Sequence, residues 1–180
     1  ASRACPSRCE LAALHRTVAV GTDDTILLKL VYSTERARAP LPCVIMLSGA
    51  DCAHDSYMWL AARLARAGCA VALSTCVVAF GPSTCLLSVP FDMALLGSLD
   101  EYKRGPSSAG ISAILTELRR LSGPGGALAG RLDLARLAIG GHSSGGRTAL
   151  DLAAFDNPFG IGAVFSYGAS LVNSGVGRFA

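Results

Sequence analysis

The chemistry that this chain could perform centres on Ser143, in the run Gly141-His142-Ser143-Ser144-Gly145. A serine between two glycines, at the end of an apolar strand and the start of a helix, is the pattern of a nucleophile elbow. Such a turn is so tight that a Cβ at Gly141 or Gly145 would collide with neighbouring backbone. We therefore predict that Ser143 is a nucleophile and that its hydroxyl lies at a helix N-terminus, where amide groups stabilise negative charge.

The partners that such a serine needs are missing from the sequence after it. A serine hydroxyl is a weak nucleophile until a histidine base, oriented by an acid, takes its proton. Where this elbow occurs, both partners follow the serine along the chain. No histidine follows His142, and the only later acids are Asp151 and Asp156. We therefore expect the chain as it stands to be inactive, unless an acid and a histidine lie beyond Ala180.

The other histidines and acids have structural interpretations. In an elbow the side chain of His142 points away from the serine, so we expect it to pack beside the sheet. We expect His54 to be a solvated loop histidine rather than a replacement base, because its loop approaches the oxyanion side. Three acids are assigned as follows: Asp133 caps or orients the approach to the elbow strand, Asp151 lies on the surface of the following helix, and Asp156 belongs to a turn with Asn157-Pro158.

Bulk composition limits the class of protein. A length of 180 residues is typical of one domain, and 51% hydrophobic against 16% charged residues indicates a globular, well-buried chain. The net charge of +3 comes from scattered basic residues, which argues against a nucleic-acid surface. No cysteine and histidine spacing matches a zinc site, so we predict neither a metal nor a redox cofactor.

Seven cysteines are many for a chain of this size. Cys43 and Cys69 lie in apolar, strand-like runs and are expected to be small core residues. Cys5–Cys9 and Cys76–Cys85 are either disulfides, which would indicate an oxidising compartment, or thiols. The chain begins at Ala1 without a methionine, which we interpret as a processed or trimmed end.

The pattern of apolar residues predicts a hairpin followed by strands that alternate with helices. The strands are expected at 15–20, 25–32, 42–47, 69–73, 134–139 and 161–167, and the helices at 57–67, 111–121 and 144–155. Residues 77–104 have no clear assignment. This order predicts an α/β domain over 15–172, with a mostly parallel sheet and flanking helices. Residues 1–14 would be an N-terminal extension and 173–180 a loose tail.

The tract 76–97 is unusually apolar for a connection. Pro82, Pro90 and Asp92 interrupt it, which argues against a transmembrane span. We expect part of the tract to face a hydrophobic substrate, a protein partner or, peripherally, a membrane surface.

Three stretches resemble the α/β-hydrolase fold and, within it, the dienelactone-hydrolase-like esterases, a group that includes chlorophyllases and bacterial polyester hydrolases. Residues 42–50 look like the family strand that ends in an oxyanion loop, and residues 57–73 like the next helix and strand. Residues 129–146 resemble the family elbow, including the Gly-His-Ser-x-Gly-Gly of chlorophyllases. The likeness covers roughly residues 15–170, and this last stretch is its most specific part.

The resemblance implies hydrolysis of a hydrophobic carboxylic ester by Ser143. The oxyanion hole would consist of the Ser144 amide and the amide of Gly49 or Ala50, although Ser48 stands where the family usually has histidine. The family's acid and histidine lie on later strands, so the fold looks truncated after the sixth strand. We expect a secreted, lumenal or plastid protein rather than a cytoplasmic one.

The strand at 161–167 has a consequence for partners. If it were an edge strand, it would be apolar on both faces without the Lys, Glu or Pro that guard natural edges. Either further strands cover it, or a partner covers this edge together with residues 76–97. The alternative to a hydrolase is therefore a non-catalytic structural or interaction subunit that reuses the fold.

Overall fold

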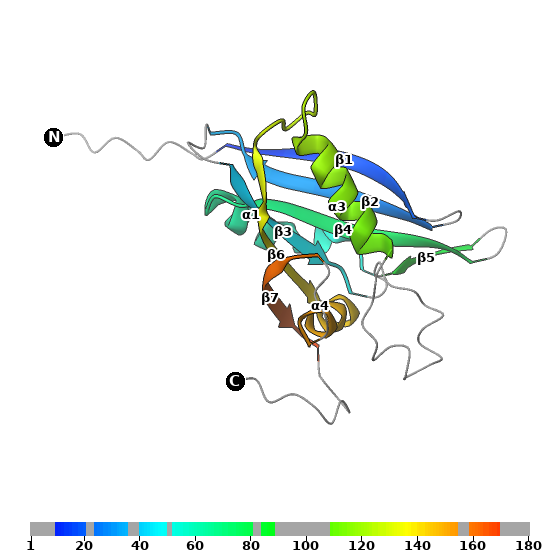
Figure 1. Cartoon of the computed structure of the whole chain (residues 1–180). Coiled ribbons are helices and arrows are strands. Elements are labelled where there is room, and N and C mark those ends of the chain that lie inside the picture. Colours follow the sequence, from blue (N-terminus) through cyan, green and yellow to red (C-terminus); the bar gives the residue numbers. More distant parts are fainter. Residues whose placement is uncertain are drawn as a thin grey trace.

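The computed structural model describes residues 10–20, 24–35, 40–49, 52–80, 84–88, 109–154 and 159–169. In these ranges seven strands form one sheet, with helices against both faces (Figure 1). The strands are β1 (Leu11–Val20), β2 (Asp24–Ser33), β3 (Leu41–Leu47), β4 (Ala70–Phe80), β5 (Thr84–Ser88), β6 (Leu132–His142) and β7 (Ile161–Tyr167). The helices are the 3-10 helix η1 (His54–Tyr57) and the α-helices α1 (Met58–Arg66), α3 (Ala109–Ser122) and α4 (Ser144–Ala154).

The sheet has the order β1-β2-β4-β3-β6-β7, and β5 pairs with β4 beyond the end of β3. β2 lies between β1 and β4 and runs antiparallel to both, whereas β4, β3, β6 and β7 run parallel to one another. The register pairs Leu47 with Gly141, and His142 with Tyr167. The carboxyl ends of β3, β6 and β7 therefore meet at one edge of the sheet, which is where ligands bind in open α/β sheets.

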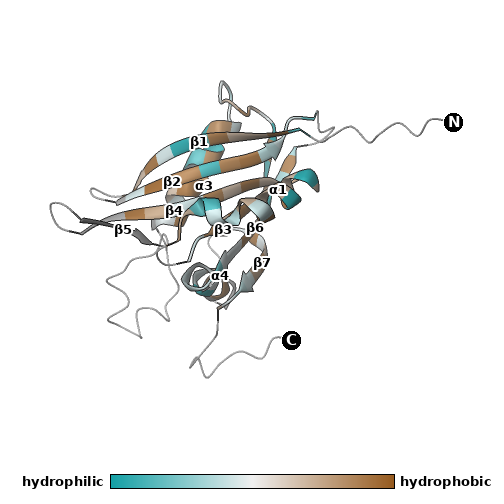
Figure 2. Ribbon diagram, turned by 180° about the vertical axis from the view of Figure 1, so that it is seen from behind, coloured by the Kyte–Doolittle hydropathy of each residue, from teal (hydrophilic) through white to brown (hydrophobic). Residues whose placement is uncertain are grey.

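Two apolar clusters hold the layers together, one on each face of the sheet. The larger cluster joins α3 and α4 to one face and includes Ile45, Leu118 and Leu152. The smaller joins α1 to the other face and includes Met46 and Ala61. α3 accordingly lies in front of the sheet in Figure 1 and behind it in Figure 2.

Hydropathy along the strands follows their position in the sheet. β3 lies in the middle with helices on both sides, and its residues are buried except for a partly buried Pro42. Figure 2 shows apolar and polar segments alternating along β1, which is at the edge of the described sheet. A central strand must be apolar on both faces, whereas an edge strand needs only one apolar face.

The sheet differs in detail from the expectation. β4 continues to Phe80 and pairs antiparallel with β5, so a seventh strand lies in the stretch 77–104, for which we predicted no element. The reason is that β4 extends past β3 and gains a new neighbour there. β1 begins at Leu11 rather than at residue 15, so the end of the predicted extension belongs to the sheet. The predicted tail, 173–180, lies outside the described residues.

The cysteines whose side chains the structure describes carry reduced thiols. Cys43, Cys52, Cys69 and Cys76 are not in disulfides, and β5 places Cys85 opposite Ala79 rather than opposite Cys76. The disulfide alternative for Cys76 and Cys85 is therefore wrong, while Cys5 and Cys9 lie outside the described residues.

Among the helices that the structure describes, none has the length and apolar character needed to cross a membrane.

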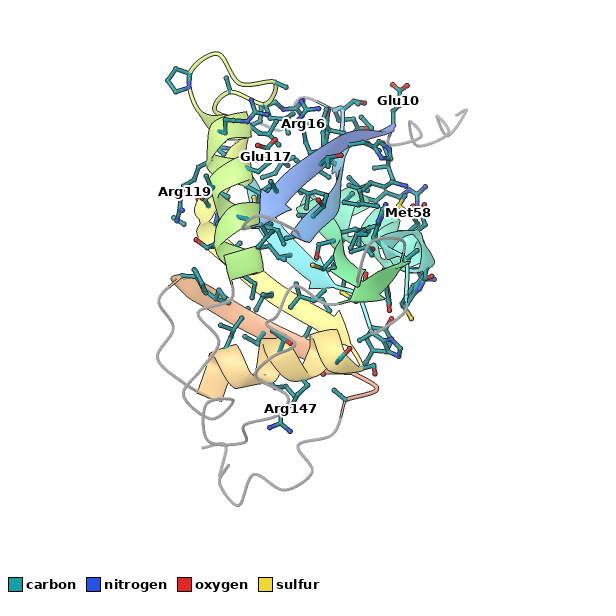
Figure 3. The ribbon with its side chains drawn as sticks, turned by 90° about the vertical axis from the view of Figure 1, so that its right-hand side faces the viewer. Glu10, Arg16, Met58, Glu117, Arg119 and Arg147 are labelled. Carbon is teal, nitrogen blue, oxygen red and sulfur yellow. The ribbon has the colours of Figure 1, made fainter. Side chains whose placement is uncertain are left out.

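A salt bridge ties the first strand to α3. The Arg16 guanidinium lies 3.3 Å from the Glu117 carboxylate, and Figure 3 shows the two side chains close together between β1 and α3. Both oxygens of Glu117 also accept hydrogen bonds from Arg120 one turn later. These cations lower the pKa of Glu117, Arg120 by the larger amount.

Candidate active site

Ser143 occupies the tight turn between β6 and α4. Its φ is 53°, and among the described residues it alone has a positive φ without being glycine. Such a conformation costs about 1–3 kcal/mol and persists only where the surroundings enforce it. Two backbone hydrogen bonds do so here: the Ser143 amide donates to Tyr167 O at 3.1 Å, and the Arg147 amide donates to Ser143 O at 2.9 Å.

The glycines around this turn allow backbone to pack on backbone. A Cβ at Gly141 would lie 2.3 Å from the carbonyl carbon of Gly145, across the turn. A Cβ at Gly145 would lie 2.4 Å from Ser48 O and 2.5 Å from Leu47 O, at the end of β3. Both separations are far below van der Waals contact. Gly141 therefore permits the turn itself, and Gly145 permits the first turn of α4 to rest against the neighbouring strand.

The loop after β3 lies directly against the elbow. A Cβ at Gly49 would be 2.9 Å from His142 Nδ1 and 3.4 Å from Ser143 Cβ, so a larger residue at this position would push the loop away. Ser48, just before it, is fully buried and donates its hydroxyl to Ser74 O on β4 at 2.7 Å. Ser48 thus fixes the start of the loop to the sheet.

The amide of Gly49 is engaged within the protein. It donates to the Tyr57 hydroxyl at 3.0 Å, and the same hydroxyl lies 3.0 Å from His142 Nδ1. An oxyanion donor must instead point at the substrate. In this structure the Gly49 amide therefore donates to Tyr57, and Ala50, the other candidate donor, lies outside the described residues.

Ser144 begins α4. The direction of a helix carries the amides of its first turn out of the helix at its N-terminus, and the helix dipole favours negative charge there. The carbonyl of Ser144 accepts a hydrogen bond from the Thr148 hydroxyl at 3.1 Å, inside the helix. Ser144 is thus held as part of a regular helix whose N-terminus starts at the elbow.

Three aromatic rings gather beside the elbow. The ring of His142 lies 4.8 Å from that of Tyr167 and 5.9 Å from that of Tyr57, centroid to centroid. Tyr57 is 3% exposed and Tyr167 39% exposed, so the group runs from the interior to the surface. Burial raises the pKa of Tyr57 to about 12, and its hydroxyl stays protonated under ordinary conditions.

His54 is not the solvated loop residue that the sequence suggested. Its side chain is only 13% exposed, its amide donates to Thr75 Oγ1 at 2.6 Å, and its Nδ1 lies 3.1 Å from the same oxygen. Burial lowers the pKa of His54, and Lys29 lowers it further, against the opposing effect of Asp55. Lys29 in turn pairs with Asp55, so this corner joins η1 to β2 and β4.

Of the three acids that the sequence places before and after the elbow, the structure describes the side chain of Asp133, at the opposite end of β6 from Ser143. Asp133 accepts a hydrogen bond from the Ala135 amide and pairs with Arg136, which fits the predicted orienting role before the elbow strand. Asp151 lies on α4, but its side chain is outside the description, as is Asp156. Figure 3 shows Arg147, on the same helix, pointing away from the sheet.

None of the three histidines of the chain has a hydrogen bond to Ser143 among the residues that the structure describes. His15 lies on β1, at the opposite end of the sheet order from β7. His54 is bonded to Thr75, and His142 to Tyr57. The described ranges also contain no group of three His, Cys, Asp or Glu side chains that could hold a metal ion. The described part of the site therefore consists of Ser143 in its tight turn and the N-terminus of α4.

No sequence pattern singles out Tyr57, which was expected only to begin a helix. The two groups bonded to its hydroxyl are 8 and 85 positions away along the chain. No local pattern connects them, and a tyrosine at a helix start has no special meaning. The closeness of Cys52 to this hydroxyl, which also raises the pKa of Tyr57, was not foreseen for the same reason.

Solved structures with the same fold include a dienelactone hydrolase-like promiscuous phosphotriesterase from metagenomic libraries, with a TM-score of 0.59 and 18% identity over 88% of this chain. They also include a putative dienelactone hydrolase from Klebsiella pneumoniae, with a TM-score of 0.54 and 19% identity over 95%. A ferulic acid esterase from Streptomyces cinnamoneus follows at 0.52 and 18% over 85%. No family model and no curated protein sequence matches the chain.

These similarities establish the fold, which is that of the α/β-hydrolases, as predicted. The neighbours are dienelactone hydrolase-like proteins and esterases, but the identities are too low to carry more than the architecture. The chain spans 59% of the length of the metagenomic protein, 63% of the Klebsiella protein and 58% of the Streptomyces protein.

Proposed function

We propose that this chain carries the nucleophile of a serine-dependent carboxylic ester hydrolase. The observation that supports the proposal best is the backbone of Ser143, held at a φ of 53° between a parallel strand and a helix. Backbone strain of this kind clusters at active sites, where it is part of the mechanism. Its effect is to present a hydroxyl at a helix N-terminus beside the loop after β3.

In the proposed reaction Ser143 Oγ forms a bond to the ester carbonyl carbon, and its proton passes to an imidazole base. The amides of Ser144 and Ala50 stabilise the resulting oxyanion. When the intermediate collapses, the bond to the alcohol oxygen breaks and the base returns the proton to that oxygen. Water then repeats the sequence on the acyl-serine and releases the acid. Removal of one oxyanion donor in such a site costs about 10²–10³ in rate.

The base and its acid are proposed to come from outside residues 1–180. His54 and His142 are each bonded to another side chain, and His15 lies on β1. On this proposal the 180-residue chain alone has little or no activity, because a serine hydroxyl without a base is a weak nucleophile. The substrate would be a hydrophobic ester, held in part by residues 76–97.

The position of β7 favours a second candidate function. β7 is the last strand in the order of the described sheet, and its Gly162 and Ala163 are exposed. An unguarded edge of this kind needs a cover. A non-catalytic subunit that binds a protein partner along β7 and residues 76–97 would also meet this need.

A fluorophosphonate probe distinguishes the two functions. We expect the longest natural form of the protein to be labelled at Ser143, and residues 1–180 alone to be labelled roughly a thousandfold or more slowly, because the base is missing. Ser143→Ala should abolish labelling. Ser112→Ala, an exposed serine on α3, should leave it unchanged. Mass spectrometry of the labelled peptide identifies the site.

If the longest natural form is folded, as circular dichroism would show, but takes up no probe, the hydrolase proposal is wrong. Co-purification of a stoichiometric partner that is lost on substitution in β7 would then support the interaction subunit.

A further inference from the structure

We infer that Tyr57 is a positioning residue, whose hydroxyl fixes the loop after β3 to the elbow through the chain of hydrogen bonds Gly49 N–H to Tyr57 Oη–H to His142 Nδ1. The effect on catalysis rests on the proposed function, whereas the chain of hydrogen bonds itself does not.

The directions of these hydrogen bonds follow from counting protons. An amide can only donate, so Tyr57 Oη accepts from Gly49 at 3.0 Å. The hydroxyl has one proton of its own to donate, and its neighbours are His142 Nδ1, at 3.0 Å, and the Cys52 thiol. An unprotonated imidazole nitrogen is a strong acceptor and sulfur is a weak one. The proton of Tyr57 therefore goes to His142.

This direction determines the tautomer of His142. With Nδ1 as acceptor, the neutral ring carries its proton on Nε2. Nδ1 faces Gly49 and Tyr57, whereas Nε2 faces the turn after β7, where a Cβ on Gly168 would lie 3.1 Å away. His142 then acts through Tyr57 and not on the substrate, which explains why a histidine directly before the serine is not its base.

The hydrogen bond between Gly49 and Tyr57 joins the beginning of the loop to its end. Gly49 lies two residues after the end of β3, and Tyr57 is the last residue of η1, just before α1. Between them the Cys52 amide donates to Gly49 O at 3.2 Å, and His54 is bonded to Thr75 on β4. Tyr57 is 3% exposed and packs against the α1 face of the sheet, so its hydroxyl is a fixed point. Gly49, the described residue of the loop next to Ser143, is thereby fixed beside the elbow.

The direct test is amide hydrogen exchange and imidazole ¹⁵N NMR on the isotope-labelled protein. In the unmodified protein we expect a protected Gly49 amide and His142 with its proton on Nε2. Tyr57→Phe removes the acceptor of that amide, and its exchange should rise roughly tenfold, the equivalent of one net hydrogen bond. Tyr167→Phe removes the same atom from the neighbouring ring and should change neither readout.

A second pair of variants guards against a failure of Tyr57→Phe to fold. His142→Asn keeps a side-chain acceptor near the position of Nδ1, and His142→Leu does not. We expect Gly49 protection to be retained in the asparagine variant and reduced in the leucine variant. Equal protection in both variants, or a proton on Nδ1 in the unmodified protein, would overturn the inference.

Labelling of Ser143 by the fluorophosphonate probe then tests the catalytic consequence. If the longest natural form is labelled, Tyr57→Phe should slow labelling about tenfold or more, because a misplaced oxyanion donor costs rate. An unchanged rate alongside faster Gly49 exchange would overturn the positioning role. If the unmodified protein is not labelled at all, the proposed function fails, while the exchange and tautomer results still decide the hydrogen-bond chain.

Discussion

The elbow and the loop after β3 meet at the same edge of the sheet, but different forces hold them. The elbow is fixed by backbone packed on backbone, which is possible because Gly141 and Gly145 have no Cβ that would collide. The loop is fixed by side chains, through Tyr57 on one side and His54 with Thr75 on the other. A steric constraint fails abruptly when an atom is added, whereas a hydrogen-bonded constraint weakens by one bond at a time.

The largest effect is expected from Gly145→Ala. The new Cβ would lie 2.4 Å from Ser48 O and 2.5 Å from Leu47 O, and these backbone atoms leave it no room. We expect the free energy of unfolding to fall by about 3 kcal/mol or more, together with loss of probe labelling. Denaturant unfolding measures the change.

Gly162→Ala on β7 is the matched control, because its Cβ would meet Leu137 O at an ordinary 3.7 Å. It should alter stability by less than about 0.5 kcal/mol. Similar losses in both variants would mean that the contact with β3 is not what makes Gly145 necessary.

Gly140→Ala should have the next largest effect and should be partly repairable. Its Cβ would lie 2.2 Å from the Phe165 ring, a side chain rather than backbone. We expect a loss of about 1–3 kcal/mol, of which Gly140→Ala with Phe165→Leu recovers a part. A double-mutant cycle measures the coupling, and strict additivity of the two changes would contradict a direct clash.

Thr75→Val tests the side-chain anchor of the loop. Thr75 is 1% exposed, and the change leaves the His54 amide and ring without their shared oxygen. We expect a loss of about 1–3 kcal/mol in the free energy of unfolding. Thr75→Ser keeps the oxygen and should lose clearly less, so equal losses would point to packing instead.

The smallest effect is a dependence of stability on pH through His54. Burial lowers its pKa from 6.5, so below pH 6.5 the unfolded chain binds more protons than the folded chain. The free energy of unfolding should therefore fall as the pH drops through 6.5 and the lowered value, and His54 should contribute no slope well above pH 6.5.

Urea unfolding at a series of pH values measures this slope, and His54→Gln should remove it. Asp55, whose pKa is lowered from 3.8 chiefly by Lys29, contributes in the same direction but only at lower pH. A variant that keeps the full slope just below pH 6.5 would show that another group is responsible.

The same contrast explains what the sequence could predict. The elbow was predictable because its requirements lie within five consecutive positions, and only glycine satisfies two of them. The central strands were predictable because burial on both faces demands continuous apolar runs such as Cys43–Leu47. The sequence did carry a clue to β5, since Gly81-Pro82 separates two apolar runs, as turn dipeptides do.

The loop was not predictable, because its contacts connect distant positions. Thr75 is 21 positions from His54, and His142 is 85 from Tyr57. No local sequence pattern indicates that the Gly49 amide donates its hydrogen bond to a tyrosine hydroxyl rather than to a substrate oxyanion. Such pairings become visible only once the sheet has brought β3, β4 and β6 together.

The buried thiol of Cys43 gives the protein an internal reporter of its own unfolding. Cys43 is 1% exposed, and its burial, with Asp133 nearby, raises the pKa of the thiol to about 12. Alkylating reagents react with thiolates. In the native state Cys43 is therefore protected both because the reagent cannot reach it and because its thiol stays protonated. Cys52 and Cys69 are partly accessible. Pulse alkylation followed by peptide mapping would therefore separate local opening near the loop from opening of the central sheet without any introduced label.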